Sequence, residues 1–289
     1  QFCNLSTVNM SACDTPEDLY SAVAAASFFG TLQASYTDFP FLREKWQETT
    51  VKDTPSSPSS SGIADTASRF DMATVATAAW EAERTNFNTA DLIGVNKAAR
   101  VTAIKPEGSS STVLGSSSGI HARHAPYYLR RIRLGSDDSA LVEYLKTKVS
   151  GLLEDDKYGP DSVVLTVPQK SPKGAICRNN ENVKSQFYRA MAFNEKWVQR
   201  GHYSGRNHNN VSCTLSVKDD EWETLRNLMW INRFGYNGLS VLPYDGGTYT
   251  QAPFEECDEA TYDKVSALVK DLDLREIVES EDATNMTAI

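Results

Sequence analysis

The sequence predicts an α/β fold in which strands and helices alternate along the chain. Two observations support this prediction: short apolar runs with strand periodicity are followed by longer segments with helical periodicity, and this order repeats through the 289 residues. Such repetition is typical of a parallel sheet, either open or closed as a barrel. The length permits one large domain or two smaller ones.

The chain is predicted to begin with a strand and a helix. Residues 2–8 alternate apolar and polar side chains, as a strand does. Thr15 then provides an N-cap, Pro16 stands at the first helical position and an acidic residue follows at the third. A helix should therefore run from here to about Ser35.

A second helix is expected over residues 70–92, where apolar residues recur at helical spacing, and Gly94 should end it. A strand is expected over residues 100–104. Between the two helices, residues 53–62 are rich in Pro and Ser and contain no core-forming residue, so on their own they indicate a linker.

The second half continues the alternation of strands and helices. The strand near residue 165 is expected to be buried because its apolar residues are consecutive, and a later helix should turn Trp222, Leu225 and Met229 inward. The remaining expected elements are strands over 130–134, 162–167, 211–217 and 238–242 and helices over 140–149 and 182–199.

Composition narrows the class of protein. With 38 acidic and 29 basic side chains the net charge is -9, which disfavours binding to nucleic acid. The five cysteines form no CxxC pair and no even disulfide set, which fits a reducing cytoplasm. No apolar run is long enough for a membrane span and no signal peptide is visible, so we expect a soluble protein.

The most informative segment is the run of small residues at 105–121, which follows the expected strand at 100–104. Serine hydroxyls and closely approaching backbone N–H groups suit a phosphate group, although a flexible loop without a ligand is the alternative. His121, Arg123 and His124 flank the run and are expected either to neutralise an anion or to be solvated charges.

The remaining candidates for chemistry are cysteines and histidines. Cys3 lies in the first strand, where a lone Cys is usually a small buried hydrophobe and a redox role is the alternative. Cys213 receives the structural interpretation more firmly. His202 and His208 lack metal-ligand spacing, so no metal site is predicted. The P-loop and dinucleotide-binding motifs are absent, which weakens kinase and dehydrogenase interpretations.

An ordered set of short motifs resembles the large catalytic chain of ribonucleotide reductases, most closely the adenosylcobalamin-dependent class (class II). The motifs run in the family's order over most of the chain. They are Phe2-Cys3-Asn4-Leu5, Ala99 to Pro106, the serine loop ending in Gly119-Ile120-His121, Tyr127-Tyr128-Leu129-Arg130-Arg131, Asn210-Val211-Ser212-Cys213-Thr214 and Leu242-Pro243-Tyr244-Asp245-Gly246-Gly247.

The resemblance implies a fold and a set of site residues. Family members have a ten-stranded α/β barrel built from two five-stranded halves. This chain resembles the second half, with residues 1–272 as the C-terminal part of the catalytic barrel and residues 273–289 as a tail. By the same likeness Cys3 is a reducing cysteine, and the loop that binds the substrate phosphates is matched by Glu107, Ser109, Ser110 and Ser111.

The chain departs from the family pattern in three places. The cysteine that carries the thiyl radical should lie upstream of Cys3, where this sequence does not extend, so the chain is expected to be a fragment. The C-terminal CxxxxC shuttle is absent. Residues 55–61, a Pro/Ser run, stand where the family has an apolar barrel strand, so that strand is expected to be replaced or damaged.

The resemblance implies thiyl-radical reduction of ribonucleoside tri- or diphosphates to 2′-deoxyribonucleotides for DNA synthesis. It implies adenosylcobalamin, with its cobalt, as radical source, a thioredoxin-like or dithiol reductant, and a missing N-terminal half of the barrel as partner. The alternatives are a reductase with a tyrosyl radical on a partner subunit, a non-catalytic phosphate-binding half of a split or truncated reductase, and a generic barrel enzyme acting on sugar phosphates, with Glu107 as its sole candidate.

Overall fold

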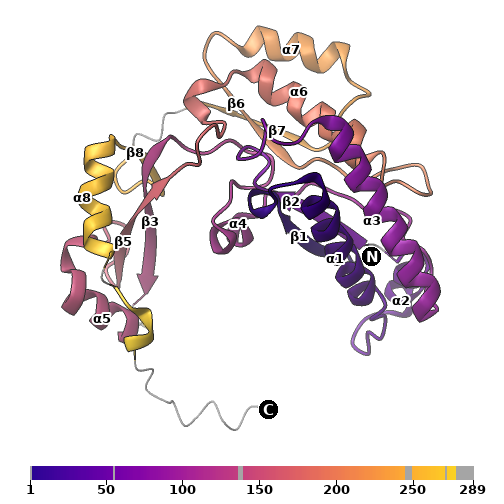
Figure 1. The fold of residues 1–289 in the computed structure, drawn as a ribbon, viewed down its shortest axis with the longest axis horizontal. Helices are drawn as coiled ribbons and strands as arrows, with labels where there is room; N and C mark the ends of the chain where they lie inside the picture. The colour runs from indigo at the N-terminus through magenta and orange to yellow at the C-terminus, as the bar shows by residue number, and fades with distance from the viewer. Residues whose placement is uncertain (1, 55, 136–138, 245–248, 271, 278–289) are drawn as a thin grey trace. The chain divides into compact units, whose positions relative to one another are not determined.

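The computed structural model describes residues 2–54, 56–135, 139–244, 249–270 and 272–277. The chain forms two compact units, one of residues 1–123 and 172–244 and the other of residues 124–171 and 245–289 (Figure 1). The first unit contains the expected Cys3 and serine-loop residues. The expected tail over 273–289 lies mostly outside the described residues.

The first unit begins with a strand, a helix and a second strand, as a parallel β-α-β arrangement requires. Strand β1 (Asn4–Asn9) pairs in parallel with β2 (Ser56–Ser61) along its whole length. Helices α1 (Pro16–Ala34) and α2 (Glu44–Asp53) connect them, and α1 packs on both strands. The predicted start of α1 is confirmed, because Thr15 and Asp18 form a capping box.

The prediction of a linker at residues 53–62 is wrong, since Ser56–Ser61 is strand β2 and all six of its residues are buried. The reason is the close approach of α1. A Cβ atom added to Gly30 would lie 2.7 Å from Ser56 Oγ, so only small side chains fit at this contact. Pro58 provides no N–H, but its carbonyl accepts from the N–H of Ala103 at 3.2 Å. Serine therefore acts here as a small strand residue.

Helix α3 (Met72–Ile93) matches the helix expected over 70–92. Asp71 caps its start by accepting from Thr74 N at 2.7 Å, and Gly94 ends it with φ 74°. Four of its alanines, Ala78, Ala79, Ala82 and Ala90, are fully buried, and Ser27 of α1 donates to the carbonyl of Ala82 at 2.6 Å.

The segment at 100–104 joins the two pairs of parallel strands. It forms only isolated bridges, one of them from Ile104 to Val211, and it carries the Ala103 bond to β2. Beyond Val211, β6 (Cys213–Val217) pairs in parallel with β7 (Leu239–Pro243). Hydrogen bonds thus link β1, β2, residues 100–104, residues 211–217 and β7 in chain order.

Helices of the C-terminal part of this unit enclose the core around Trp197, whose indole N–H donates to the Ala103 carbonyl at 2.9 Å. The expected inward position of Trp222 is wrong: it is 42% exposed at the first turn of its helix, whereas Leu225 is 3% exposed. The helical elements are α4 (Gly108–Leu114), α6 (Val183–Phe193), a π-turn at Asn194–Val198, α7 (Trp222–Ile231) and the 3₁₀ turns Met10–Ala12 and Arg178–Asn180.

The second unit contains a four-stranded sheet in the order β4-β5-β3-β8, and all its pairs are antiparallel. The prediction of a parallel sheet is therefore wrong for this unit. Most residues of β5 are only partly buried, as is common in antiparallel sheets, so the expected burial of 162–167 is also wrong. The elements are β3 (Tyr127–Gly135), α5 (Ser139–Val149), a 3₁₀ turn at Ser150–Leu152, β4 (Leu153–Asp155), β5 (Ser162–Lys170), β8 (Phe254–Glu256), α8 (Glu259–Val269) and a 3₁₀ turn at Leu274–Glu276.

Candidate functional site

Strands β1 and β2 present small polar side chains, together with Leu5, on the side that faces away from α1. Side chains alternate along a strand, and Ser6 of β1 points to α1, where its hydroxyl donates to the Ala26 carbonyl at 2.8 Å. Cys3 and Thr7 therefore point the other way, together with Ser57, whose Oγ lies 3.5 Å from Cys3 Sγ. We call the side chains of Cys3, Thr7, Ser57, Ser59 and Ser61 the polar face.

Cys3 is exposed on the polar face, so the interpretation as a small buried hydrophobe is wrong. Its thiol is a donor to Ser57 Oγ, and Ser57 Oγ also accepts from Asn209 Nδ2 at 3.3 Å. An exposed thiol held by a hydroxyl is available to a substrate or to a second thiol. The redox role of Cys3 stays a prediction.

Glu107 joins the serine loop to the polar face. Its backbone has the left-handed conformation (φ 56°, ψ 44°) immediately before α4, and its Oε2 atom accepts from Thr7 Oγ1 at 2.6 Å. Its other carboxylate oxygen, Oε1, is buried and has no hydrogen-bond partner among the described residues. One acceptor of Glu107 is therefore left over for a donor that the described residues do not supply.

The three serines expected to bind phosphate form the first turn of α4 and differ in what they expose. Ser109 and Ser110 are exposed. Ser111 is buried, and its hydroxyl donates to the Gly108 carbonyl at 3.2 Å. The hydroxyls of Ser109 and Ser110 are therefore available to a ligand, while that of Ser111 is used within the helix.

Several polar residues adjoin the same face; Lys105 and Asn210 belong to the sequence motifs but were given no role there, and Asn209 was missed. Lys105 donates through its backbone N–H to Ser59 Oγ at 2.9 Å and through Nζ to Asn210 Oδ1 at 3.2 Å. Asn209 also donates to the Thr102 carbonyl at 3.0 Å. The available signal was the adjacent pair of Asn residues directly before an expected strand, since amide side chains at a strand end are often placed for binding.

Arg123 was expected either to meet an anion or to be solvated, but the structure gives it a buried partner. Its guanidinium makes two bonds to the carboxylate of Asp65, each of 2.8 Å. Sequence reasoning missed Asp65 altogether, because the two residues are far apart in the chain and lie in segments without a motif. Arg123 is thus part of the framework of the serine loop, not a charge directed at a ligand.

His121 also has a structural environment. Its Nδ1 lies 3.0 Å from the Ser118 carbonyl, and its Nε2 accepts from the Thr214 N–H at 3.0 Å. This pattern requires the neutral ring with the proton on Nδ1. Burial lowers the pKa of His121, which agrees with that neutral form. His124 belongs to the other unit, where it stacks on Phe254.

Three of the other cysteines are buried, in contrast to the exposed Cys3. Cys213 is 6% exposed on β6, and burial raises the pKa of its thiol to about 11, so it is protonated at neutral pH. The structural interpretation of Cys213 is confirmed. Cys13 and Cys177 are buried as well, and burial raises the pKa of Cys13.

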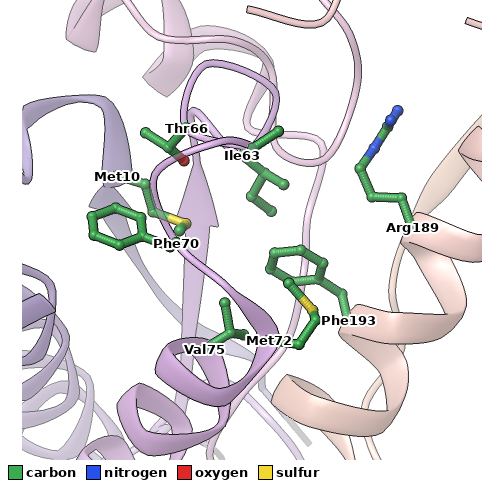
Figure 2. Close-up of a pocket in the computed structure, with 9 residues that line it drawn as sticks. Met10, Ile63, Thr66, Phe70, Met72, Val75, Arg189 and Phe193 are labelled. Atoms are coloured by element: carbon green, nitrogen blue, oxygen red, sulfur yellow. The ribbon is translucent and has the colours of Figure 1, made fainter.

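A separate cavity of about 140 Å³ lies in the first unit, between the segment at residues 63–75 and helix α6 (Figure 2). Its wall includes Met10, Phe70, Met72 and Phe193, and the guanidinium end of Arg189 is directed away from those side chains. An apolar wall does not suit a phosphate or a sugar. The cavity therefore differs in chemistry from the polar face and is not the candidate site.

The described residues contain neither a cluster of metal ligands nor a membrane-spanning helix. In the part of the chain that the structure describes, no three His, Cys, Asp or Glu side chains gather as a metal site would require. None of the described helices combines the length and the apolar character needed to cross a membrane.

The fold defined here is that of class II ribonucleotide reductases. The chain superimposes on a crystal structure of a B12-dependent (class II) ribonucleotide reductase with a TM-score of 0.78, over 95% of this chain and 41% of that one, at 22% sequence identity. The resemblance read from the motifs is thereby confirmed at the level of fold, while a half of a ten-stranded barrel stays a prediction.

Curated relatives of the chain are adenosylcobalamin-dependent ribonucleoside-triphosphate reductases. The enzyme of Lactobacillus delbrueckii subsp. bulgaricus is 31% identical over 177 residues, 60% of this chain and 23% of that enzyme. The Lactobacillus acidophilus enzyme is 29% identical over 189 residues, which are 64% of this chain and 24% of that enzyme. A probable enzyme of this kind from Dictyostelium discoideum is 27% identical over 189 residues, which again are 64% of this chain and 24% of the relative. No protein-family model matches the chain. The chain spans about a quarter of the length of the curated relatives it matches.

Proposed function

We propose that this chain supplies part of the catalytic domain of an adenosylcobalamin-dependent ribonucleoside-triphosphate reductase. The observation that carries the proposal is the contact of Thr7 with Glu107, which brings the strand of the exposed Cys3 and the serine loop to one face. Similarity to named reductases over 60% of the chain supports the reaction class. The complete enzyme would convert a ribonucleoside triphosphate to its 2′-deoxy form.

The proposed chemistry balances with two thiols. The ribose loses its 2′-hydroxyl as water, and two cysteine thiols give up two hydrogens and form one disulfide, which an external dithiol or thioredoxin-like protein then reduces. Cys3 is proposed as one of these thiols. Its partner thiol and the cysteine that carries the radical would belong to protein outside this chain, as the resemblance implies.

The serine loop is proposed to bind the substrate phosphates. Ser109 and Ser110 offer exposed hydroxyls, and their backbone N–H groups lie in the first turn of α4, where a helix has no internal acceptors. Ser111 is proposed to contribute its backbone, since its hydroxyl is bonded to Gly108. The unpartnered Oε1 of Glu107 would accept a hydroxyl of the ribose or a bound water.

The cofactor of the complete enzyme is proposed to be adenosylcobalamin, which would supply the initiating radical. The described residues contain no cluster of metal-ligating side chains, and both ring nitrogens of His121 are used within the fold. We assign none of the described residues to the corrin or its cobalt.

The remaining proposals concern architecture and setting. Residues 1–272 are proposed as the C-terminal part of a ten-stranded barrel that needs an N-terminal half, and the chain-order linkage of its parallel strands supports this. Residues 273–289 are proposed as a tail. A cytoplasmic location fits free cysteines.

The proposal is tested with the complete gene product, a ribonucleoside triphosphate, a dithiol and adenosylcobalamin. Wild-type protein should form deoxynucleotide over many turnovers, whereas Cys3→Ser should stop at no more than a single turnover because one reducing thiol is lost. Cys257→Ser is the matched control, since Cys257 lies in the other unit, and should keep activity. Nucleotide binding without product in the wild type would contradict the enzyme and favour a non-catalytic phosphate-binding half.

A further inference from the structure

The buried ion pair of Asp65 and Arg123 lies directly behind the serine loop. The carboxylate of Asp65 is 1% exposed and the side chain of Arg123 is 7% exposed. Arg123 Nε donates to Asp65 Oδ1 and Arg123 Nη2 donates to Asp65 Oδ2, both at 2.8 Å. This fork geometry fixes the position of both side chains.

The same two side chains hold backbone groups of the loop that follows α4. Asp65 Oδ2 accepts from Ser117 N at 2.8 Å, and Arg123 Nη2 donates to the Gly115 carbonyl at 2.7 Å. Gly115 is the residue at which α4 ends. The ion pair therefore clamps the C-terminal end of the helix whose first turn carries the proposed phosphate ligands.

Asp65 also connects this clamp to the turn that follows β1. Its Oδ2 atom accepts from Ser11 Oγ at 2.7 Å, and Ser11 follows β1. Separate bonds from β1 reach α4: Thr7 donates to Glu107, and Asn9 donates to the Leu114 carbonyl at 3.2 Å. Helix α4 is thus tied to β1 directly and, through Asp65, by a second path.

The chemistry of the pair favours a positioning role over a role in stability. Burying two charges costs desolvation free energy. The attraction between the charges offsets this cost only when every hydrogen bond of the pair is satisfied, so a buried ion pair adds little net stability to the fold. What it supplies is a fixed arrangement, because the carboxylate accepts from the Ser117 N–H while the guanidinium donates to the Gly115 carbonyl. We propose that Asp65 is a positioning residue that sets the serine loop for triphosphate binding.

This inference rests on the proposed function, because it requires the serine loop to bind phosphate. Asp65 itself does not touch the substrate. It acts through Ser117 and, with Arg123, through Gly115, which keep α4 against β1. An amide at position 65 would bring an NH₂ group toward the donors of Arg123 or Ser117 and so would release at least one of these contacts.

The test compares wild type with Asp65→Asn in the full chain. Two quantities are measured: the ratio of dissociation constants for a ribonucleoside and its triphosphate, and hydrogen exchange at the Ser117 amide. We expect the preference for triphosphate to fall by about tenfold, as the loss of one charge-assisted contact predicts, with faster Ser117 exchange. Asn86→Ala is the control. Asn86 is a buried residue of α3 whose amide donates to Thr31 Oγ1 and accepts from the Ala98 N–H.

The outcomes separate the two claims. Loss of the triphosphate preference in Asp65→Asn but not in Asn86→Ala supports the positioning role. Retention of the preference and of Ser117 protection in Asp65→Asn overturns it and leaves the proposed function intact. A wild-type chain without any triphosphate preference overturns the phosphate loop and the role of Asp65 together. If Asp65→Asn does not fold, Arg123→Lys replaces it, because one ammonium cannot reproduce the forked contacts.

Discussion

His121 joins two segments that the fold must keep together, and replacing it has a predictable cost. Its ring accepts from the Thr214 N–H and donates to the Ser118 carbonyl. His121→Phe keeps a ring but leaves the Thr214 N–H without this partner, while the Ser118 carbonyl keeps the bond from the His121 N–H at 2.9 Å. A buried group deprived of its partner costs about 1 to 3 kcal/mol, so we expect a loss of about 2 kcal/mol from the Thr214 N–H.

The same bond makes the stability of the first unit depend on pH. Burial lowers the pKa of His121, and Arg189 lowers it further, against the opposing effects of the Ser118 hydrogen bond and of Glu181. The folded state therefore binds the proton less readily than the unfolded state, whose pKa is about 6.5. The contribution of His121 is complete above that pH and falls as the pH drops toward the folded pKa, by at most about 1.4 kcal/mol per pH unit.

Urea unfolding at pH 7.5 and pH 5.5 tests this argument. The difference in unfolding free energy between wild type and His121→Phe should be about 2 kcal/mol at the higher pH and smaller at the lower one. His121→Gln is the control, since its amide can accept and donate at similar places but does not titrate. An equal difference at both pH values would refute the assignment of a neutral, bonded His121.

Two further predictions follow from the described contacts. Gly119→Ala should lower the free energy of unfolding by more than about 3 kcal/mol in urea unfolding, because the residue has φ 54° and its new Cβ would lie 2.2 Å from the Lys105 carbonyl oxygen. The control Gly94→Ala has φ 74° but open space around it, and should lower it by about 1 kcal/mol. Equal losses for the two variants would contradict the steric argument. Iodoacetamide at pH 8 should label the exposed Cys3 well before Cys213, which is protected by its burial and its pKa of about 11. The order of labelling is read by mass spectrometry of the peptides, and earlier labelling of Cys213 would contradict the prediction.

Local signals in the sequence predicted the boundaries of helices α1 and α3 well, whereas α2 and α4 were not predicted. Thr15 and Asp18 form the expected capping box, and Gly94 ends α3 in the left-handed conformation. These boundaries depend on residues within one turn of each other, so the sequence carries the information directly. The direction of β5 could not be read in this way, because parallel and antiparallel partners are chosen by segments distant in the chain.

The candidate site shows the same division between local and distant information. The serine loop and Cys3 were visible as motifs, since each is a continuous run with a distinct composition. The partner of Arg123 was not visible, because Asp65 lies 58 residues away and neither residue belongs to a repeat or motif. The ordered set of motifs that resembles the family indicated the function more specifically than any single residue did.

The two serine-rich segments are best understood together, since each explains why the other is ordered. Alone, either one lacks the apolar surface that drives a segment to fold. In the structure Ser61 Oγ lies 2.8 Å from Ser116 Oγ, and the N–H groups of Gly62 and Ile63 donate to the carbonyls of Ser117 and Gly119. Small side chains allow this backbone-to-backbone approach, which larger apolar residues would prevent. The composition that resembles a linker is therefore what permits β2 to lie against the serine loop and to bring the polar face beside it.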